Sequence, residues 1–131
     1  MDRTGARTAA MMLVYEWEMG GEGGADTREG MLELQPDEKE FAYMEMLFNG
    51  VTEKKSVLDA EIAKYVTGWK MERIARVDLS IMRVATYEIM FTDLPNGVAV
   101  NEALEMARTY SEPKAVGFIN GVLGSIVRGL K

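Results

Sequence analysis

The sequence contains no cysteine and no histidine, and these two absences exclude whole classes of site. Without cysteine there is no disulfide and no thiolate chemistry, and a reducing cytoplasm fits that composition. Without either residue type, the usual zinc sites and histidine-based catalytic triads are excluded. No apolar run reaches 18 residues, and the first residues, MDRTGARTAA, lack the apolar core of a signal peptide. We therefore expect a cytoplasmic protein with no membrane span and no cofactor.

Positive charge is also scarce, since 15 Lys and Arg face 21 Asp and Glu, for a net charge of −6. This balance disfavours a protein that holds nucleic acid over its whole surface, because phosphate contacts need lysine and arginine. Two local basic features remain. Arg3 and Arg7 lie one predicted helical turn apart, with Tyr15 two turns further along. A second cluster precedes the central apolar segment: Lys70, Arg73 and Arg76. Ordinary surface charge is the common explanation, and RNA contact is the alternative.

Proline occurs only at positions 36, 95 and 113, and each proline falls between stretches in which apolar residues recur every three or four positions. That spacing is typical of helices with one buried face, and no stretch alternates with the period of two expected of a strand. A chain of 131 residues points to one domain, residues 1–131. We predict an all-α fold of six or seven helices. The expected helical segments are 3–19, 37–51, 52–69, 73–91, 100–110 and 115–127.

The connections between these segments carry their own signals. Residues 20 to about 35 read as a flexible loop with a short ordered piece at 28–34, because GGEGG opens it. Asp37, with Glu40 three residues on, is a candidate capping box, and Asn101 is a candidate N-cap for the segment that follows the DLPNG turn.

General acid/base pairs built from carboxylates remain possible. Glu102 and Glu105 share one face of a predicted helix, although a solvated surface explains them better than catalysis or a cation site. Asp78 and Arg83 lie on the segment that is apolar almost all round, where charges need partners. We expect a structural ion pair or cap there, with a functional role as the alternative.

The last predicted helix, AVGFINGVLGSIV, carries three glycines at 117, 121 and 124. Each glycine inside a helix costs about 1 kcal/mol relative to alanine. The chain therefore accepts three such costs in one segment, beside Phe118 and Asn120.

Several phrases together resemble the NusB family of bacterial transcription antitermination factors. They are ARTAAMMLVYEWE, LDAEIAKYVTGW, RVDLSIMRVATYEI, LPNGVAVNEALEMARTY and FINGVLGSIV, and they cover nearly the whole chain in order. The resemblance implies two roughly perpendicular three-helix bundles and no enzyme activity. It implies binding of boxA-type single-stranded RNA together with NusE, a small-subunit ribosomal protein, within an RNA polymerase antitermination complex that serves chiefly ribosomal RNA operons. Family members are monomers or homodimers. The resemblance also implies that Gly121 allows close approach of a neighbouring helix and that Asn120 satisfies buried polar groups. Gly117 and Gly124 stand where the family commonly has other residues, and they suggest a locally softened helix.

The resemblance also assigns an RNA-binding set: Arg3, Arg7, Tyr15, Asp78, Lys114 and Phe118. Arg3 and Arg7 would contact phosphates, and Lys114 would add a nearby charge. Tyr15 and Phe118 would contact bases or sugars. Asp78 would accept a hydrogen bond from a base edge. This hypothesis requires the arginine pair, Asp78 and Phe118 to converge on one exposed patch.

The chain departs from the family pattern at positions where basic residues are usual. Thr4, Gly5 and Gly117 stand at such positions. Fewer cations weaken the contribution of phosphate contacts to binding. The alternative function is therefore a protein-interaction scaffold with this fold and weak or no RNA binding.

Overall fold

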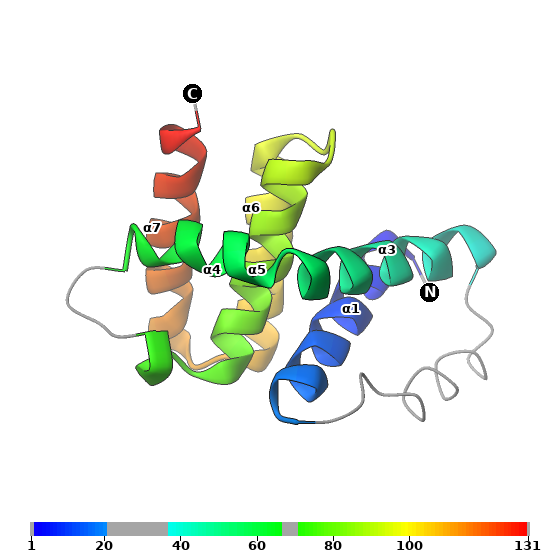
Figure 1. Ribbon diagram of the computed structural model, residues 1–131, viewed down its shortest axis with the longest axis horizontal. Helices are drawn as coiled ribbons and strands as arrows, with labels where there is room; N and C mark the ends of the chain where they lie inside the picture. The colour runs from blue at the N-terminus through cyan, green and yellow to red at the C-terminus, as the bar shows by residue number, and fades with distance from the viewer. Residues whose placement is uncertain (1, 21–36, 67–70, 131) are drawn as a thin grey trace.

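The computed structural model describes residues 2–20, 37–66 and 71–130, and these residues form helices joined by short connections (Figure 1). The elements in chain order are α1 (Arg3–Glu18), α3 (Glu38–Glu53), α4 (Lys55–Ala63), a 3₁₀ turn η1 (Met71–Arg73), α5 (Arg76–Phe91), α6 (Asn96–Tyr110) and α7 (Pro113–Gly129). No strand occurs in these three ranges, so the all-α prediction is confirmed. The predicted ordered piece at 28–34, Trp69 and Lys70 lie outside the described residues.

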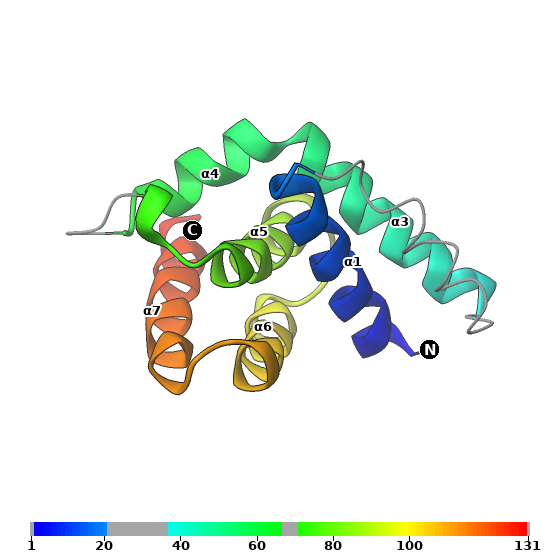
Figure 2. The same cartoon turned by 90° about the horizontal axis from the view of Figure 1, so that it is seen from below.

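Helix α5 is the centre of the molecule, as its almost uniformly apolar sequence predicts. Ten of its sixteen residues are buried. Figure 2 shows α5 surrounded by α1, α4, α6 and α7, and α5 packs directly against each of them. Helices α5, α6 and α7 lie side by side, α4 runs crosswise over α5 and α7, and α3 continues beyond them and packs on α1 (Figure 1). In the described part of the chain, no helix is both long enough and apolar enough to cross a membrane.

The buried charge on α5 has a structural role, as expected. Arg83 is 2% exposed, and its Nε and Nη2 donate to the Asp59 carboxylate at 2.8 and 3.0 Å. Glu18 lies 3.5 Å from the same guanidinium and 3.1 Å from that of Arg76. These ion pairs connect α1, α4 and α5, and a buried charge requires such partners.

Two predicted helix starts have different outcomes. Asp37 is the N-cap residue of α3, and its carboxylate accepts from the backbone N–H of Lys39 at 2.8 Å. Its expected capping-box partner, Glu40, binds Arg3. Asn101 is not an N-cap, because α6 already begins at Asn96 with Pro95 as the preceding residue. The proline supplies a suitable entry conformation, with φ −55° and ψ 135°. Asn96 and Gly97, the last two residues of the turn predicted at 93–97, lie instead in the first turn of the helix.

The roles expected of Gly121 and Asn120 in α7 are both wrong. Gly121 is exposed, and a Cβ added there would have no neighbouring atom within 4 Å. Asn120 is also exposed and therefore satisfies no buried group. The buried face of α7 is formed by Ile119, Val122, Leu123 and Ile126. Close approach occurs at Gly50 of α3, where a Cβ would overlap the Tyr87 ring of α5.

Candidate nucleic-acid interface

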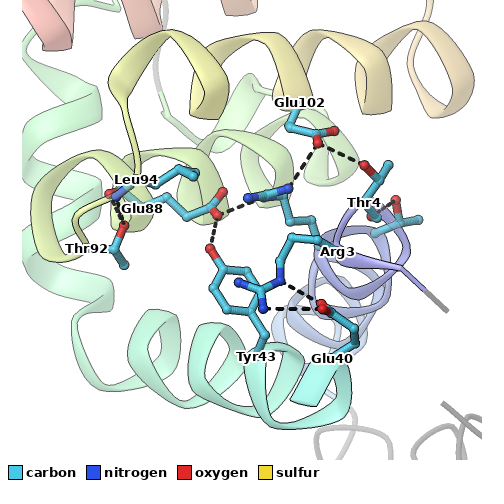
Figure 3. Close-up of polar contacts among 10 residues, drawn as sticks. Arg3, Thr4, Glu40, Tyr43, Glu88, Thr92, Leu94 and Glu102 are labelled. Carbon is cyan, nitrogen blue, oxygen red and sulfur yellow. Dashed lines mark hydrogen bonds and ion pairs between the residues drawn. The ribbon is translucent and has the colours of Figure 1, made fainter. Parts of the chain in front are cut away.

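The two N-terminal arginines belong to a network of charged groups that joins four helices. Arg7 is 3% exposed, and its guanidinium lies 2.8 Å from Oε2 of Glu88 and 3.0 Å from Oε1 of Glu102. The Tyr43 hydroxyl donates to the same Glu88 oxygen. Figure 3 shows Tyr43, Glu88 and Glu102 converging from α3, α5 and α6 on the side chains of α1. Arg7 therefore fastens α1 to the rest of the fold.

Arg3 lies at the outer edge of this network. Its Nε donates to Glu40 at 2.6 Å, and its guanidinium stacks 3.8 Å from the centroid of the Tyr43 ring (Figure 3). The Arg3 side chain retains 36% of its exposure, against 4% for Arg7. Arg3 can therefore reach a ligand without unfolding α1, whereas Arg7 cannot.

The network shifts the pKa of its titratable members. Burial, and then the hydrogen bond to Glu88, raise the pKa of Tyr43 to about 12. Burial alone would lower the pKa of Arg7, but the hydrogen bond and charge of Glu88 outweigh it and raise that pKa. Tyr43 therefore stays protonated and Arg7 charged across the neutral range.

A separate groove of about 650 Å³ opens where the start of α5, the end of α6 and the start of α7 meet. Its walls combine aromatic, aliphatic and charged side chains. The lining residues are Arg73, Ile74, Ala75, Val77, Asp78, Tyr110, Ser111, Glu112, Lys114, Ala115 and Phe118. A mostly apolar concave site with a few polar groups is typical of ligand binding, and aromatic walls suit unpaired bases.

The polar floor of the groove is a hydrogen-bonded pair. Asp78 lies in the first turn of α5, and its Oδ1 accepts from the hydroxyl of Ser111 at 2.5 Å. Ser111 ends α6, and its backbone N–H donates to the carbonyl of Ala107 at 2.9 Å. The sequence predicts an ion pair or a cap for Asp78. The carboxylate instead accepts a hydrogen bond from the Ser111 hydroxyl, at the end of the next helix.

Cations and aromatic rings occupy the rim. Lys114 is 88% exposed at its side chain and lies 3.9 Å from a carboxylate oxygen of Glu112. Arg73 is exposed, Phe118 is half-buried, and Tyr110 is 44% exposed. A carboxylate with nearby cations and two rings can hydrogen-bond a base edge, stack on its face and attract the backbone phosphates.

The six residues predicted to bind RNA are not on a single patch. Asp78, Lys114 and Phe118 line the groove. Arg3 and Arg7 belong to the charged network at α1. Tyr15 is half-buried and belongs neither to the lining of the groove nor to that network. The predicted convergence of the arginine pair with Asp78 and Phe118 is therefore wrong. Helical periodicity placed Arg3 and Arg7 on one face but gave no information about the acidic residues from other helices that meet them.

Sequence reasoning also missed part of the groove. Sequence reasoning assigned Tyr110 no role in a site, yet it is exposed and lines the groove. Nothing in the sequence indicated that Ser111 lines a groove, beyond its place two residues before Pro113. Arg73 was noticed as one of a basic cluster, but its neighbour Arg76 turns away to bind Glu18 and the backbone carbonyls of Met71 and Ile74.

The fold and the groove together define an all-helical binding protein. The family model described as "NusB family" matches residues 4–128, so the chain belongs to the NusB family. A relative in Clostridium novyi named "Transcription antitermination protein NusB" is 37% identical over 132 residues, which cover 98% of this chain and 99% of the relative. The expectation of an antitermination factor of this family, rather than an enzyme, is thereby confirmed.

Solved structures support the same fold. NusB of T. maritima superposes with a TM-score of 0.87 at 28% identity, covering 98% of this chain and 92% of that one. A structure described as antitermination factors NusB and NusE in complex with dsRNA gives a TM-score of 0.86 at 24% identity, over 97% and 96% of the two chains. The predicted NusB-like all-α architecture is confirmed.

Proposed function

We propose that this protein binds boxA-type single-stranded RNA together with a NusE-type ribosomal protein, and that the groove formed by α5, α6 and α7 contacts the RNA. The observation that carries the proposal is the meeting of Asp78, Lys114 and Phe118 in one groove, although they come from two helices. A protein of the same fold has been crystallised with NusE and dsRNA, which supports the choice of a NusE-type protein and of RNA as partners.

The roles in this proposal follow from exposure. Phe118 would contact a base or sugar, Asp78 would accept from a base edge, and Lys114 would attract phosphate. Arg3 and Tyr15 would extend the contact along α1. Arg7 is not assigned a phosphate, because reaching one would break its buried contacts with Glu88 and Glu102. The partner would supply further cations, which offset the net charge of −6.

The wider assembly belongs to the same proposal. The RNA-bound pair would join RNA polymerase in the cytoplasm and support antitermination, chiefly on ribosomal RNA operons. The same interface could operate in a monomer or a homodimer.

The test is a filter-binding assay at low salt with boxA-type RNA and a scrambled RNA, each with and without NusE. We expect preference for boxA-type RNA and markedly tighter binding with NusE. Phe118→Ala should weaken binding at least about five-fold, the lower range for loss of one base stack. Phe91→Ala is the matched control, because Phe91 is an exposed ring at the opposite end of α5.

A scaffold without RNA binding is the second candidate. The observation that favours it is the neutralisation of Arg3 and Arg7 by carboxylates of the chain itself. Equal affinity for the two RNAs, even with NusE present, would support the scaffold and contradict the RNA proposal.

A further inference from the structure

The carboxylate of Asp78 is held at one oxygen and open at the other. Its Oδ1 accepts from the Ser111 hydroxyl at 2.5 Å, while Oδ2 accepts no hydrogen bond from any residue in the described ranges. Ser111 is itself fixed, because it terminates α6 with an extended backbone and its N–H is bonded to Ala107. Both residues line the groove. The groove therefore presents one carboxylate oxygen whose position depends on Ser111.

The number of available oxygens matters because the bases differ in their donors. An ionised carboxylate can only accept hydrogen bonds. Guanine presents two adjacent donors on its Watson–Crick edge, N1–H and the N2 amino group, which match both oxygens of a free carboxylate. Adenine and cytosine present one amino group beside an acceptor. Uracil presents one N–H between two carbonyls, and a carboxylate repels those carbonyls. The Ser111 hydroxyl uses one of the two acceptor sites of Oδ1, so a second donor must share that oxygen with it, whereas Oδ2 is open. This carboxylate therefore suits a base with a single amino donor better than it suits the paired donors of guanine.

We propose that Ser111 is a positioning residue that leaves Oδ2 as the one fully open accepting oxygen of Asp78. The groove then selects adenine or cytosine over guanine and uracil at one position of the bound RNA. This inference rests on the proposed function and names the base class that the same site takes. The rings of Tyr110 and Phe118 line the groove and supply stacking surfaces that are tolerant of base identity, so discrimination falls to Asp78.

The experiment uses the full chain with NusE and a set of boxA-type single-stranded RNAs in which each position carries each of the four bases in turn. The position contacted by Asp78 is the one whose base preference disappears in Asp78→Asn. There the wild type should prefer adenine or cytosine. Ser111→Ala frees Oδ1, so binding of the guanine RNA relative to the adenine or cytosine RNA should rise at least about five-fold, the lower range for a bidentate base contact.

Two variants separate positioning from general structure. Ser111→Thr keeps the hydroxyl and should keep the wild-type preference. Thr109→Val removes an exposed hydroxyl that bonds the Glu105 carbonyl outside the groove, and it should change nothing. If Ser111→Ala does not fold, the isosteric pair Ser111→Thr and Ser111→Val makes the same comparison, since an extended backbone accepts both side chains.

The outcomes are distinct for the two proposals. RNA binding with an unchanged base preference in Ser111→Ala, or an equal loss for all four bases, overturns the role of Ser111 alone. A wild type with no RNA preference overturns the proposed function and this inference with it.

Discussion

Arg7 shows at the scale of one residue how tertiary contacts change the role of a side chain. From its sequence position it is an N-terminal cation available to phosphate. In the fold it is 3% exposed and shares the carboxylates of Glu88 and Glu102. A buried pair gives little net stability compared with apolar replacements, but losing one partner leaves the other charge buried and unpaired. The identity of Arg7 is therefore explained by folding.

Arg7→Met should lower the free energy of unfolding by about 3–5 kcal/mol, because among the described residues the Glu88 carboxylate then keeps only the Tyr43 hydroxyl as a close partner. Urea unfolding followed by circular dichroism measures this. Arg3→Met is the control, and its loss should stay below about 1 kcal/mol because that side chain is 36% exposed. Similar losses in the two variants would contradict the structural role of Arg7.

The raised pKa of Tyr43 predicts how the free energy of unfolding responds to alkaline pH. Its pKa is raised to about 12 in the folded protein, above the ordinary value of 10.0, so folding favours the protonated phenol. Its contribution is fully present below pH 10 and is lost as pH rises from about 10 through 12. Tyr43→Phe should therefore lose less stability than the wild type between pH 9 and about 12.

The measurement is the difference in unfolding free energy at the two ends of that pH range. Tyr110→Phe is the matched control, since it removes an exposed phenol from the groove and should keep the wild-type dependence. If the unfolding free energy falls equally with pH in Tyr43→Phe and in the wild type, folding does not raise the pKa of Tyr43.

At the scale of one element, helix α7 shows that the effect of a glycine on stability depends on its surroundings. Gly117 and Gly121 lie on its solvent side, and neither has a neighbouring atom within 4 Å of an added Cβ. In α3, by contrast, Gly50 is buried under the Tyr87 ring. The same residue type thus weakens one helix without a packing reason and permits close packing in another.

Gly117→Ala and Gly121→Ala should each raise the free energy of unfolding by up to about 1 kcal/mol, because alanine is the better helix former and meets no obstacle. Gly50→Ala should lower it by about 1–3 kcal/mol, because the added methyl displaces the Tyr87 ring. Thermal unfolding of the three variants measures both the expected increases and the expected decrease in stability. A fall in Gly117→Ala would show that the glycine is required in the folded backbone.

At the scale of the whole molecule, the net charge of −6 limits how RNA can be held. In the proposed function the chain does not rely on a broad positive surface, so binding would depend on a few cations near the groove and on the partner. The exposed cations at the groove rim are Arg73 and Lys114. The salt dependence of binding counts such contacts directly, because each neutralised phosphate releases a counterion.

The double variant Arg73→Ala with Lys114→Ala should reduce the slope of log affinity against log salt by about 1.4, at roughly 0.7 per phosphate on a single strand. Arg108→Ala with Arg128→Ala removes the same charge at exposed positions outside the groove, and it should leave the slope nearly unchanged. Equal changes in both double variants would indicate a diffuse electrostatic effect instead of contacts at the groove.

The sequence by itself determined the helices, the central place of α5 and the family, because helical periodicity, prolines and local motifs can be recognised from residues that are close together in the chain. It also pointed to Asp78, Lys114 and Phe118. Only the tertiary structure decided that Arg7 is buried with Glu88, 81 residues away in the chain, and that Ser111 meets Asp78 across 33 residues. Such contacts depend on how helices pack against one another, and one helix's periodicity shows which face is buried but not what that face meets.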